Sequence, residues 1–273
     1  MSDWVEIRIS GAAHRQAVID ALFDCGSQGI EEKGTDIVTH LPSGSPENEI
    51  RAAIVSVDPG AVIDIRDADP LDYSGWRAAV KSHRLGSLTV APPWLSGETD
   101  PASTIVIDPA MAFGTGEHGT TRGVIRLMQR VMTPESIVAD LGAGSAVLSI
   151  AAARLGAARA IAIELDPDAT GNALENIRVN DVADRVHFFE GDAFALLPLV
   201  APVSVVLANI LSSVLVELLP VIHDSLAPGG HAILSGILFQ ERDMMLEEIG
   251  HGGWQVEAED SEEEWWSVLI RRS

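Results

Sequence analysis

Short apolar runs separated by longer amphipathic stretches make up the chain from residue 101 onward. The runs are too short for helices and predict buried parallel strands. They lie at residues 104–107, 137–141, 160–163, 186–190, 203–208 and 232–235. The stretches between them hold strong helix formers and predict helices at 122–132, 146–155, 167–180, 211–226 and 239–249. Strands that alternate with helices favour an open, Rossmann-like α/β sheet.

The last part of the chain departs from this alternation. Residues 254–258 and 265–271 predict an antiparallel hairpin around the acidic run 259–264. Such a hairpin at the end of an open parallel sheet is unusual for a dinucleotide-binding domain.

The first 68 residues follow a different order. Strand patterns at 4–9, 29–32, 36–41 and 62–66 enclose helix patterns at 12–25 and 47–56. Strand, helix, two strands, helix, strand is the split βαβ order of a small ferredoxin-like α+β domain. We therefore expect one domain over residues 1–68, a linker over 69–100 and a second domain over 101–273.

The expected linker contains more aromatic and basic residues than its neighbours. Residues 73–83 predict a helix and residues 88–91 a strand. Aromatic and basic side chains together can form a nucleic-acid surface, but here they are few and lie in an acidic chain. We favour a linker in which Trp76 and Trp94 pack onto the neighbouring domains.

A glycine turn lies between the strand at 137–141 and the helix that follows it. Gly142 and Gly144 allow a sharp turn and let a ligand approach the backbone. Glu164 ends the next strand, roughly 20 residues later, where nucleotide-binding sheets place the carboxylate that holds ribose hydroxyls. A tight turn alone would explain two glycines, but the full order favours a nucleoside-bearing ligand.

The residues beside this turn indicate which nucleoside is bound. Val147 occupies the place of the third glycine of the dinucleotide fingerprint, which weakens a pyrophosphate interpretation. Asp140 adds negative charge where a pyrophosphate would be repelled. S-adenosylmethionine carries a sulfonium and an ammonium group, so its charge fits this site better.

Two further stretches predict ligand contacts. Residues 108–122 contain three glycines, His118 and three threonines, which is more than a connector needs. Thr120 and Thr121 can cap the helix that follows. His118 could be a base, but a lone histidine without an identifiable carboxylate partner is more often structural. Asn209 ends an apolar strand and should face the ligand crevice, although it could also cap the next helix.

Composition excludes several classes of protein. The 273 residues carry a formal net charge of −22, which disfavours direct nucleic-acid binding because phosphate contacts depend on Lys and Arg. The acidic surface would attract a basic partner, or only keep the protein soluble. Cys25 is the single cysteine, which excludes an internal disulfide and a cysteine metal cluster, and we expect no bound metal. No stretch resembles a signal peptide or a membrane span, so we expect a soluble cytoplasmic protein.

Four motifs resemble one known family. DPAMAFGTGEHGTT (108–121), DLGAGSAVLSIAAARLGA (140–157), ANIL (208–211) and LAPGGHAILSGIL (226–238) look like the PrmA-type methyltransferases of ribosomal protein L11. The resemblance is dense from Asp108 to Ile237. It extends more weakly over the N-terminal domain and the linker, which match the family in their order and their length. It implies a class I S-adenosylmethionine-dependent methyltransferase sheet, in which a C-terminal hairpin is ordinary. It also implies methyl transfer to amino groups of ribosomal protein L11, on lysine side chains, the N-terminal amine or both.

The resemblance also implies site residues. Contacts to S-adenosylmethionine would come from Thr121, Gly142, Glu164 and Asn209, with Phe113 and Gly144 lining the same site. No dedicated catalytic base is evident. The sequence departs from the family pattern at Gly119, where proline is usual, and at Ala143 and Ala146, where cysteine and glycine are usual. Glu164 replaces the usual aspartate, and its carboxylate on a longer stem should still bind ribose.

Three other functions stay open at this point. A related enzyme could methylate lysines of a different protein with the same cofactor residues. An NAD-dependent oxidoreductase would share the open sheet, but the absent third glycine and the C-terminal hairpin argue against it. A non-catalytic module could use the cofactor as a sensor, which the acidic surface and the separate N-terminal domain would allow.

Overall fold

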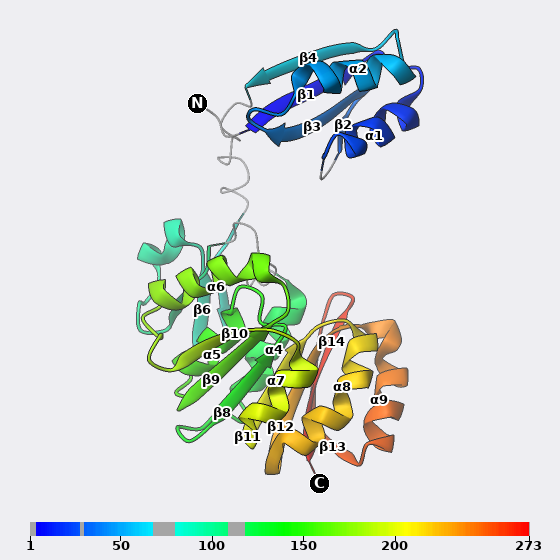
Figure 1. Cartoon of the computed structure of the whole chain (residues 1–273). Coiled ribbons are helices and arrows are strands. Elements are labelled where there is room, and N and C mark those ends of the chain that lie inside the picture. The colour runs from blue at the N-terminus through cyan, green and yellow to red at the C-terminus, as the bar shows by residue number, and fades with distance from the viewer. Residues whose placement is uncertain (1–3, 28–29, 68–79, 109–117, 273) are drawn as a thin grey trace. The chain divides into compact units, whose positions relative to one another are not determined.

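The computed structural model describes residues 4–27, 30–67, 80–108 and 118–272. The chain divides into two compact units, residues 1–79 and 80–273 (Figure 1). Each unit has its own sheet and its own apolar core. Residues 83–98 of the expected linker fold as part of the second unit.

The first unit has the element order that the sequence predicts. Its elements are β1 (Trp4–Ser10), α1 (Arg15–Asp24), β2 (Glu31–Lys33), β3 (Asp36–Pro42), α2 (Glu47–Val57) and β4 (Val62–Asp67). The four strands form an antiparallel sheet in the order β2-β3-β1-β4. The ferredoxin-like assignment stays an interpretation of this order.

Period-two alternation in β1 explains how this sheet packs. Ile7 and Ile9 are fully buried among the apolar side chains of α1 and α2. Glu6 and Arg8 point to the opposite face, where Glu6 forms an ion pair with Arg66 at 2.7 Å. Hydrogen bonds from Arg66 and Arg8 lower the pKa of the Glu6 carboxyl, against the opposing effect of burial, which is the largest single contribution.

The second unit is built on a seven-stranded sheet in the order β10-β9-β8-β11-β12-β14-β13. Its strands are β8 (Ile137–Leu141), β9 (Arg159–Glu164), β10 (Val186–Glu190), β11 (Val203–Asn209), β12 (Leu226–Leu238), β13 (Trp254–Glu262) and β14 (Trp265–Arg272). The first five are mutually parallel, and β14 pairs antiparallel with β12 and β13. The predicted open sheet with a C-terminal antiparallel hairpin is confirmed.

Helices cover both faces of this sheet (Figure 1). They are α4 (Gly119–Met128), α5 (Val147–Arg154), α6 (Pro167–Val179), α7 (Ala193–Val200), α8 (Ser212–Ser225) and α9 (Arg242–His251), with 3-10 turns η1 (Pro93–Glu98) and η2 (Phe239–Glu241). In β11, Val205 and Leu207 belong to the core shared with α4, α5 and α6, whereas Val206 and Ala208 belong to the core shared with α7, α8 and α9. A strand that is apolar on both faces is typical of a doubly wound sheet. The sequence patterns missed α7.

A small three-stranded sheet precedes the large one. It consists of β5 (His83–Leu85), β6 (Leu88–Ala91) and β7 (Thr104–Val106). Most of the helix predicted over 73–83 lies outside the described residues, but its last residue, His83, begins a strand, so that end of the prediction was wrong. The side chain of Gln129 attaches this sheet to the second unit by accepting from Ser87 N and donating to Leu85 O.

The acidic run predicted as the hairpin turn is mostly strand. β13 continues to Glu262, and the turn is left to Glu263 and Glu264. The prediction failed because the acids looked solvated, whereas Asp260 and Glu262 contact arginines of α4. Ion pairing allows a strand to extend through charged positions.

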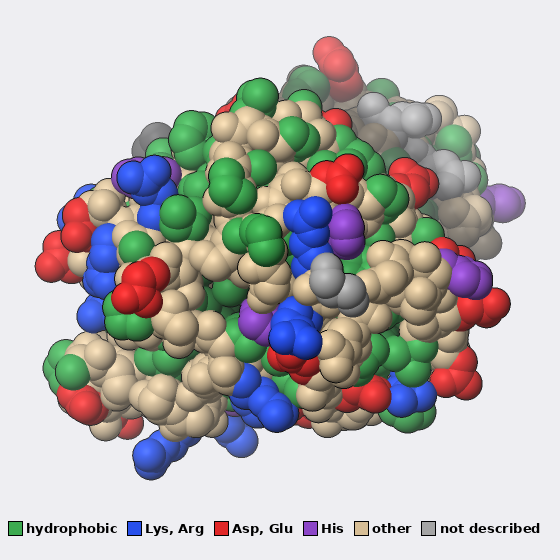
Figure 2. Space-filling view, turned by 90° about the horizontal axis from the view of Figure 1, so that it is seen from below, with side chains coloured by type: hydrophobic (Ala, Val, Ile, Leu, Met, Phe, Trp, Pro, Cys, Tyr) green, Lys and Arg blue, Asp and Glu red, His purple; other side chains and the backbone are tan. Residues whose placement is uncertain are grey.

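The charge of −22 is not gathered into one patch on the face drawn in Figure 2. Acidic, basic and apolar side chains are interspersed there. No helix in the described parts of the chain is long and apolar enough to cross a membrane.

Candidate methyl-donor site

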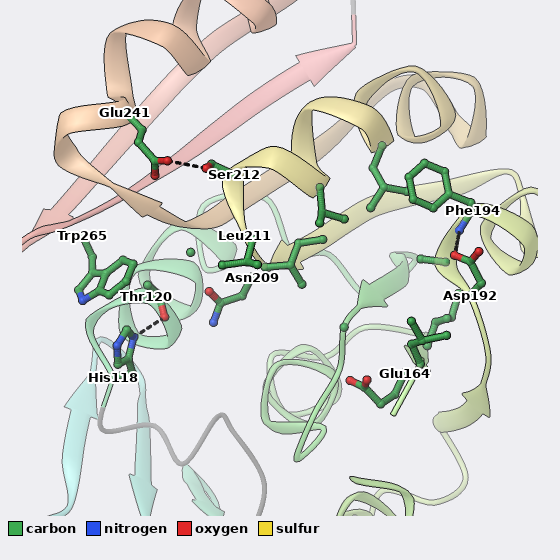
Figure 3. Close-up of a pocket in the computed structure, with 18 of the residues that line it drawn as sticks. His118, Thr120, Glu164, Asp192, Phe194, Asn209, Leu211, Ser212, Glu241 and Trp265 are labelled. Atoms are coloured by element: carbon green, nitrogen blue, oxygen red, sulfur yellow. Dashed lines mark hydrogen bonds between the residues drawn. The ribbon is translucent and has the colours of Figure 1, made fainter. Parts of the chain in front are cut away.

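A pocket of about 680 Å³ opens at the carboxyl ends of the parallel strands (Figure 3). It lies where β8 and β11 are neighbours and the strand order reverses, which is the usual ligand site of an open α/β sheet. Its volume lies within the range of small-molecule sites. The glycine turn after β8, the ends of β9 and β10, and Asn209 of β11 contribute to its lining.

Glu164 is held in place by the backbone on both sides of it. One carboxylate oxygen accepts from Gly144 N at 2.7 Å, and the other accepts from Asp166 N at 2.8 Å. Each oxygen keeps a lone pair for a further donor. The carboxylate is therefore oriented before a ligand arrives, and a ribose hydroxyl could donate to it.

Gly142 is required by both its conformation and its surroundings. Its φ is +69°, in the left-handed region that favours glycine. A Cβ here would lie 2.5 Å from Cγ2 of Ile210, the residue after Asn209. The turn after β8 therefore packs directly against the residue that follows β11, and this packing requires glycine at position 142.

Ala146 also adopts a left-handed conformation, with φ of 62° and ψ of 18°. It precedes α5 rather than forming its first turn, although the sequence pattern placed it in the helix. Glycine adopts this conformation more readily than alanine, which carries a cost of roughly 1–2 kcal/mol. This is the position at which the related family usually has glycine.

Asp140 is fully buried beneath the glycine turn. Its Oδ2 accepts from the N–H and the hydroxyl of Ser149, at 3.0 and 2.8 Å, whereas Oδ1 has no hydrogen-bond partner within the described ranges. Burial is the main cause that raises the pKa of Asp140 to about 7, and the Ser149 hydrogen bonds oppose it. The predicted negative charge beside the turn is therefore buried in the fold and does not line the pocket.

The side chain of Asn209 lines the pocket between its two ends (Figure 3). Its Nδ2 donates to the hydroxyl of Thr121 at 3.4 Å, and its buried Oδ1 has no hydrogen-bond partner among the described residues. The alternative role as a helix cap is wrong, because Leu211 occupies the cap position of α8 without a side-chain hydrogen bond. A buried acceptor that is left unpaired at a pocket wall points to a donor on the ligand.

His118 and Trp265 form one wall of the pocket. Their ring centroids lie 4.7 Å apart, and Nδ1 of His118 lies 2.7 Å from the hydroxyl of Thr120. The predicted capping of α4 by Thr120 and Thr121 is wrong, because His118 is the cap residue and both threonines lie inside the helix. Thr121 is fully buried behind Asn209 and does not line the pocket itself.

Ion pairs fix α4 against the C-terminal hairpin that carries Trp265. Arg122 pairs with Glu262 at 2.6 Å, and Arg126 pairs with both Glu262 and Asp260. These contacts lower the pKa of the Glu262 carboxyl, with the Arg122 hydrogen bond as the largest cause. The first turn of α4 and the start of β14 are thus held together at the pocket.

The remaining polar groups lie at two ends of the pocket (Figure 3). Asp192 follows β10 and accepts from Phe194 N at 2.9 Å. At the other end, Ser212 donates to Glu241 at 2.7 Å. The carboxylates lining the pocket are Glu164, Asp192 and Glu241, and none of the described lining residues is Lys or Arg. Such a lining favours a ligand with positive charge.

Three of the four predicted cofactor residues, Gly142, Glu164 and Asn209, therefore meet in one pocket, and the fourth, Thr121, supports Asn209. Their contacts with a cofactor stay a prediction. Gly144 donates to Glu164, while Phe113 lies outside the described residues. Reasoning from the sequence missed the lining residues Asp192, Phe194, Ser212, Glu241 and Trp265. Only Asp192 carried a usable signal, since it follows the third parallel strand directly after Gly191.

Comparison with known proteins agrees with this geometry. Residues 61–273 match the family described as Ribosomal protein L11 methyltransferase (PrmA). A protein of that name from Trichlorobacter lovleyi is 38% identical over 94% of each chain. Another, from Pelobacter propionicus, is 38% identical over 73% of this chain and 66% of its own length.

Solved structures give the same result. The ribosomal protein L11 methylase of Lactobacillus delbrueckii subsp. bulgaricus superposes with a TM-score of 0.63 at 27% identity, covering 71% of this chain and 99% of that one. The precorrin-6y C5,15-methyltransferase of Geobacter metallireducens, with a TM-score of 0.50 at 18% identity over 62% of this chain and 94% of that one, shares the fold alone.

The fold and the pocket define a class I methyltransferase, a class whose fold indicates the use of S-adenosylmethionine. The chain belongs to the Ribosomal protein L11 methyltransferase (PrmA) family.

Proposed function

We propose that this enzyme transfers methyl groups from S-adenosylmethionine to amino groups of ribosomal protein L11, on lysine side chains, the N-terminal amine or both. Family membership supports the substrate. The single observation that carries the chemistry is the buried Oδ1 of Asn209, which has no partner among the described residues and belongs to the wall of a pocket without Lys or Arg among its described lining residues. An amide oxygen in such a pocket can accept from an amine and orient its lone pair.

The side of the pocket lined by Glu164, Asp192 and Phe194, which we call the donor half, fits the proposed cofactor. Glu164 can accept from ribose hydroxyls, and Gly142 lines the same pocket without a side chain. Asp192 and Phe194 line the same side and offer an acceptor and an aromatic face for an adenine ring. When bound, S-adenosylmethionine supplies a methyl group already activated on a sulfonium.

The protein's task is then to position the acceptor nitrogen. Attack requires a neutral amine, whereas free lysine has a pKa of about 10.4 and is charged at pH 7. We assign no dedicated base, and water can take the proton before attack. Asn209 would hold the neutral amine in line, and alignment of this kind supplies a large part of the rate.

We further propose that residues 1–68 recognise the protein substrate. They form a unit separate from the one that holds the donor pocket. The acidic character of the chain supports a basic partner, since opposite charge speeds and orients association. Direct contact with nucleic acid is not part of the proposal.

Labelled S-adenosylmethionine tests the function directly. The full-length protein is incubated with ribosomal proteins from cells that lack its gene, and the labelled band is identified by mass spectrometry. We expect label on ribosomal protein L11, at amino groups. Label on another lysine-bearing protein would replace the substrate, and cofactor binding without transfer to any protein would make the chain a sensor.

A further inference from the structure

One carboxylate of the pocket is not needed by the donor half. Glu241 ends η2. Its Oε1 accepts from the Ser212 hydroxyl at 2.7 Å, and its Oε2 accepts from Leu238 N at 2.9 Å. These two bonds fix the carboxylate and leave each oxygen with a further lone pair.

The position of Glu241 separates it from the residues proposed for the donor. In the view of Figure 3, Glu241 and Trp265 lie on one side of Asn209, whereas Glu164 and Phe194 lie on the other. A ligand seated over Glu164 with its reactive end at Asn209 leaves the side of Glu241 and Trp265 open to the second substrate. Among the described lining residues, no Lys or Arg neutralises Glu241.

We propose that Glu241 binds the ammonium form of the acceptor side chain, beside the ring of Trp265, and so selects lysine-like acceptors. This inference rests on the proposed function. A charge-assisted hydrogen bond to a carboxylate and the face of an indole both favour a cation. Leu211 precedes Ser212, and Leu238 donates its N–H to Glu241. Both line the pocket, are exposed by 71% and 38%, and can cover the aliphatic stem of a lysine.

This role makes a prediction about protonation. A carboxylate next to an ammonium group stabilises the positive charge of that group and raises the pKa of the ammonium. Glu241 therefore favours binding of the charged acceptor and disfavours its deprotonation. The ammonium loses its proton to water, and the nitrogen lone pair then forms the N–C bond at Asn209 as the C–S bond of the donor breaks.

The test uses the Glu241→Gln variant of the full chain. The new amide can accept from Leu238 N and donate to the Ser212 oxygen, so the local fold is kept. We expect KM for the protein acceptor to rise about tenfold and the Kd of S-adenosylmethionine to stay within about twofold. The midpoint of kcat against pH should move down by roughly 0.5–1 unit, because the acceptor amine loses a neighbouring charge.

Glu247→Gln is the matched control. Glu247 is exposed on α9, and Glu247→Gln changes the net charge by the same amount as Glu241→Gln. We expect Glu247→Gln to change neither KM for the protein acceptor nor the midpoint of kcat against pH. An unchanged KM and midpoint in Glu241→Gln would overturn the inference. A loss of cofactor affinity would also overturn it, because Glu241 would then belong to the donor half.

A binding measurement separates this inference from the proposed function. Calorimetry with Nα-acetyl-lysine amide, in the presence of S-adenosylhomocysteine, measures the acceptor subsite without any protein substrate. Weaker binding to Glu241→Gln than to wild type supports the subsite even where ribosomal protein L11 receives no label. Equal binding to both proteins refutes the subsite, whatever protein is methylated.

Discussion

The amide of Asn209 donates to the hydroxyl of Thr121 at 3.4 Å, and its buried Oδ1 has no partner in the described parts of the chain. Thr121 thereby holds the orientation of the amide. We expect Asn209→Ala to lower kcat about 100-fold, because the acceptor nitrogen loses its alignment. Thr121→Val keeps the shape of the side chain and removes its hydroxyl. It should lower kcat less than Asn209→Ala does, because the amide of Asn209 is then out of its productive orientation only part of the time. Single-turnover kinetics with saturating cofactor measure both. Wild-type rates in Asn209→Ala would refute the orienting role.

Glu164→Ala should weaken S-adenosylmethionine binding more than tenfold, because ribose loses a charged acceptor. The same change releases Gly144 N and Asp166 N, which both donate to this carboxylate. Calorimetry measures the affinity. Glu190→Ala is a control at the end of the neighbouring strand, since Glu190 does not line the pocket. Unchanged affinity in Glu164→Ala would contradict the placement of the ribose.

Asp140 should make the stability of the protein fall as pH rises. The pKa of its carboxyl is about 7 in the folded protein and near its ordinary value of 3.8 in the unfolded chain. The protonated form therefore favours folding, and this stabilisation is complete below pH 3.8 and lost as the pH rises through 7. The loss is on the order of 4 kcal/mol.

Asp140→Asn isolates this effect, because asparagine can keep the Ser149 bonds and stays neutral. Urea unfolding of both proteins at pH 5 and pH 8 measures the free energy of unfolding. Wild type should lose stability relative to Asp140→Asn between these two values. Carboxylates with lowered pKa, such as Glu262 and Glu259, act in the opposite direction but are common to both proteins. A constant difference between the two proteins would show that Asp140 does not titrate in this range.

The N-terminal unit should govern the choice of protein and leave cofactor binding intact. A chain that begins at Val80, the first residue of the second unit, is expected to bind S-adenosylmethionine as the full chain does. Its kcat/KM for intact ribosomal protein L11 should fall at least tenfold, because the recognition surface is lost. Circular dichroism establishes that the shortened chain is folded. Full activity toward the intact protein would assign recognition to the second unit.

The centre of the large sheet was predictable because β8 and β11 are short apolar runs that are buried along nearly their whole length. The glycine turn and Glu164 were predictable for a related reason, since they lie at fixed places after β8 and β9. The part of the pocket around Trp265 and Glu241 was not predictable. It is assembled from β14 and η2, and only the pairing of β14 with β12 brings these segments together.

The predictions for charged side chains were wrong where the partner of the side chain lies far away in the sequence or in the core. Asp260 and Glu262 looked like solvated turn residues, yet they pair with Arg126 and Arg122, more than 130 residues away. Asp140 looked like a charge that faces the ligand, but it is buried against Ser149. In both cases the side chain's environment depends on tertiary packing, and no local pattern reports it.

Gly142 and Ile210 pack against each other, and they belong to two different segments, the turn after β8 and the segment after β11. Ile210 follows Asn209, which we propose to meet the incoming amine, and Gly142 belongs to the turn that we propose to lie beside the methyl donor. A side chain at position 142 would therefore displace Ile210 as well as strain the glycine turn, so a single substitution there would disturb the places of both substrates.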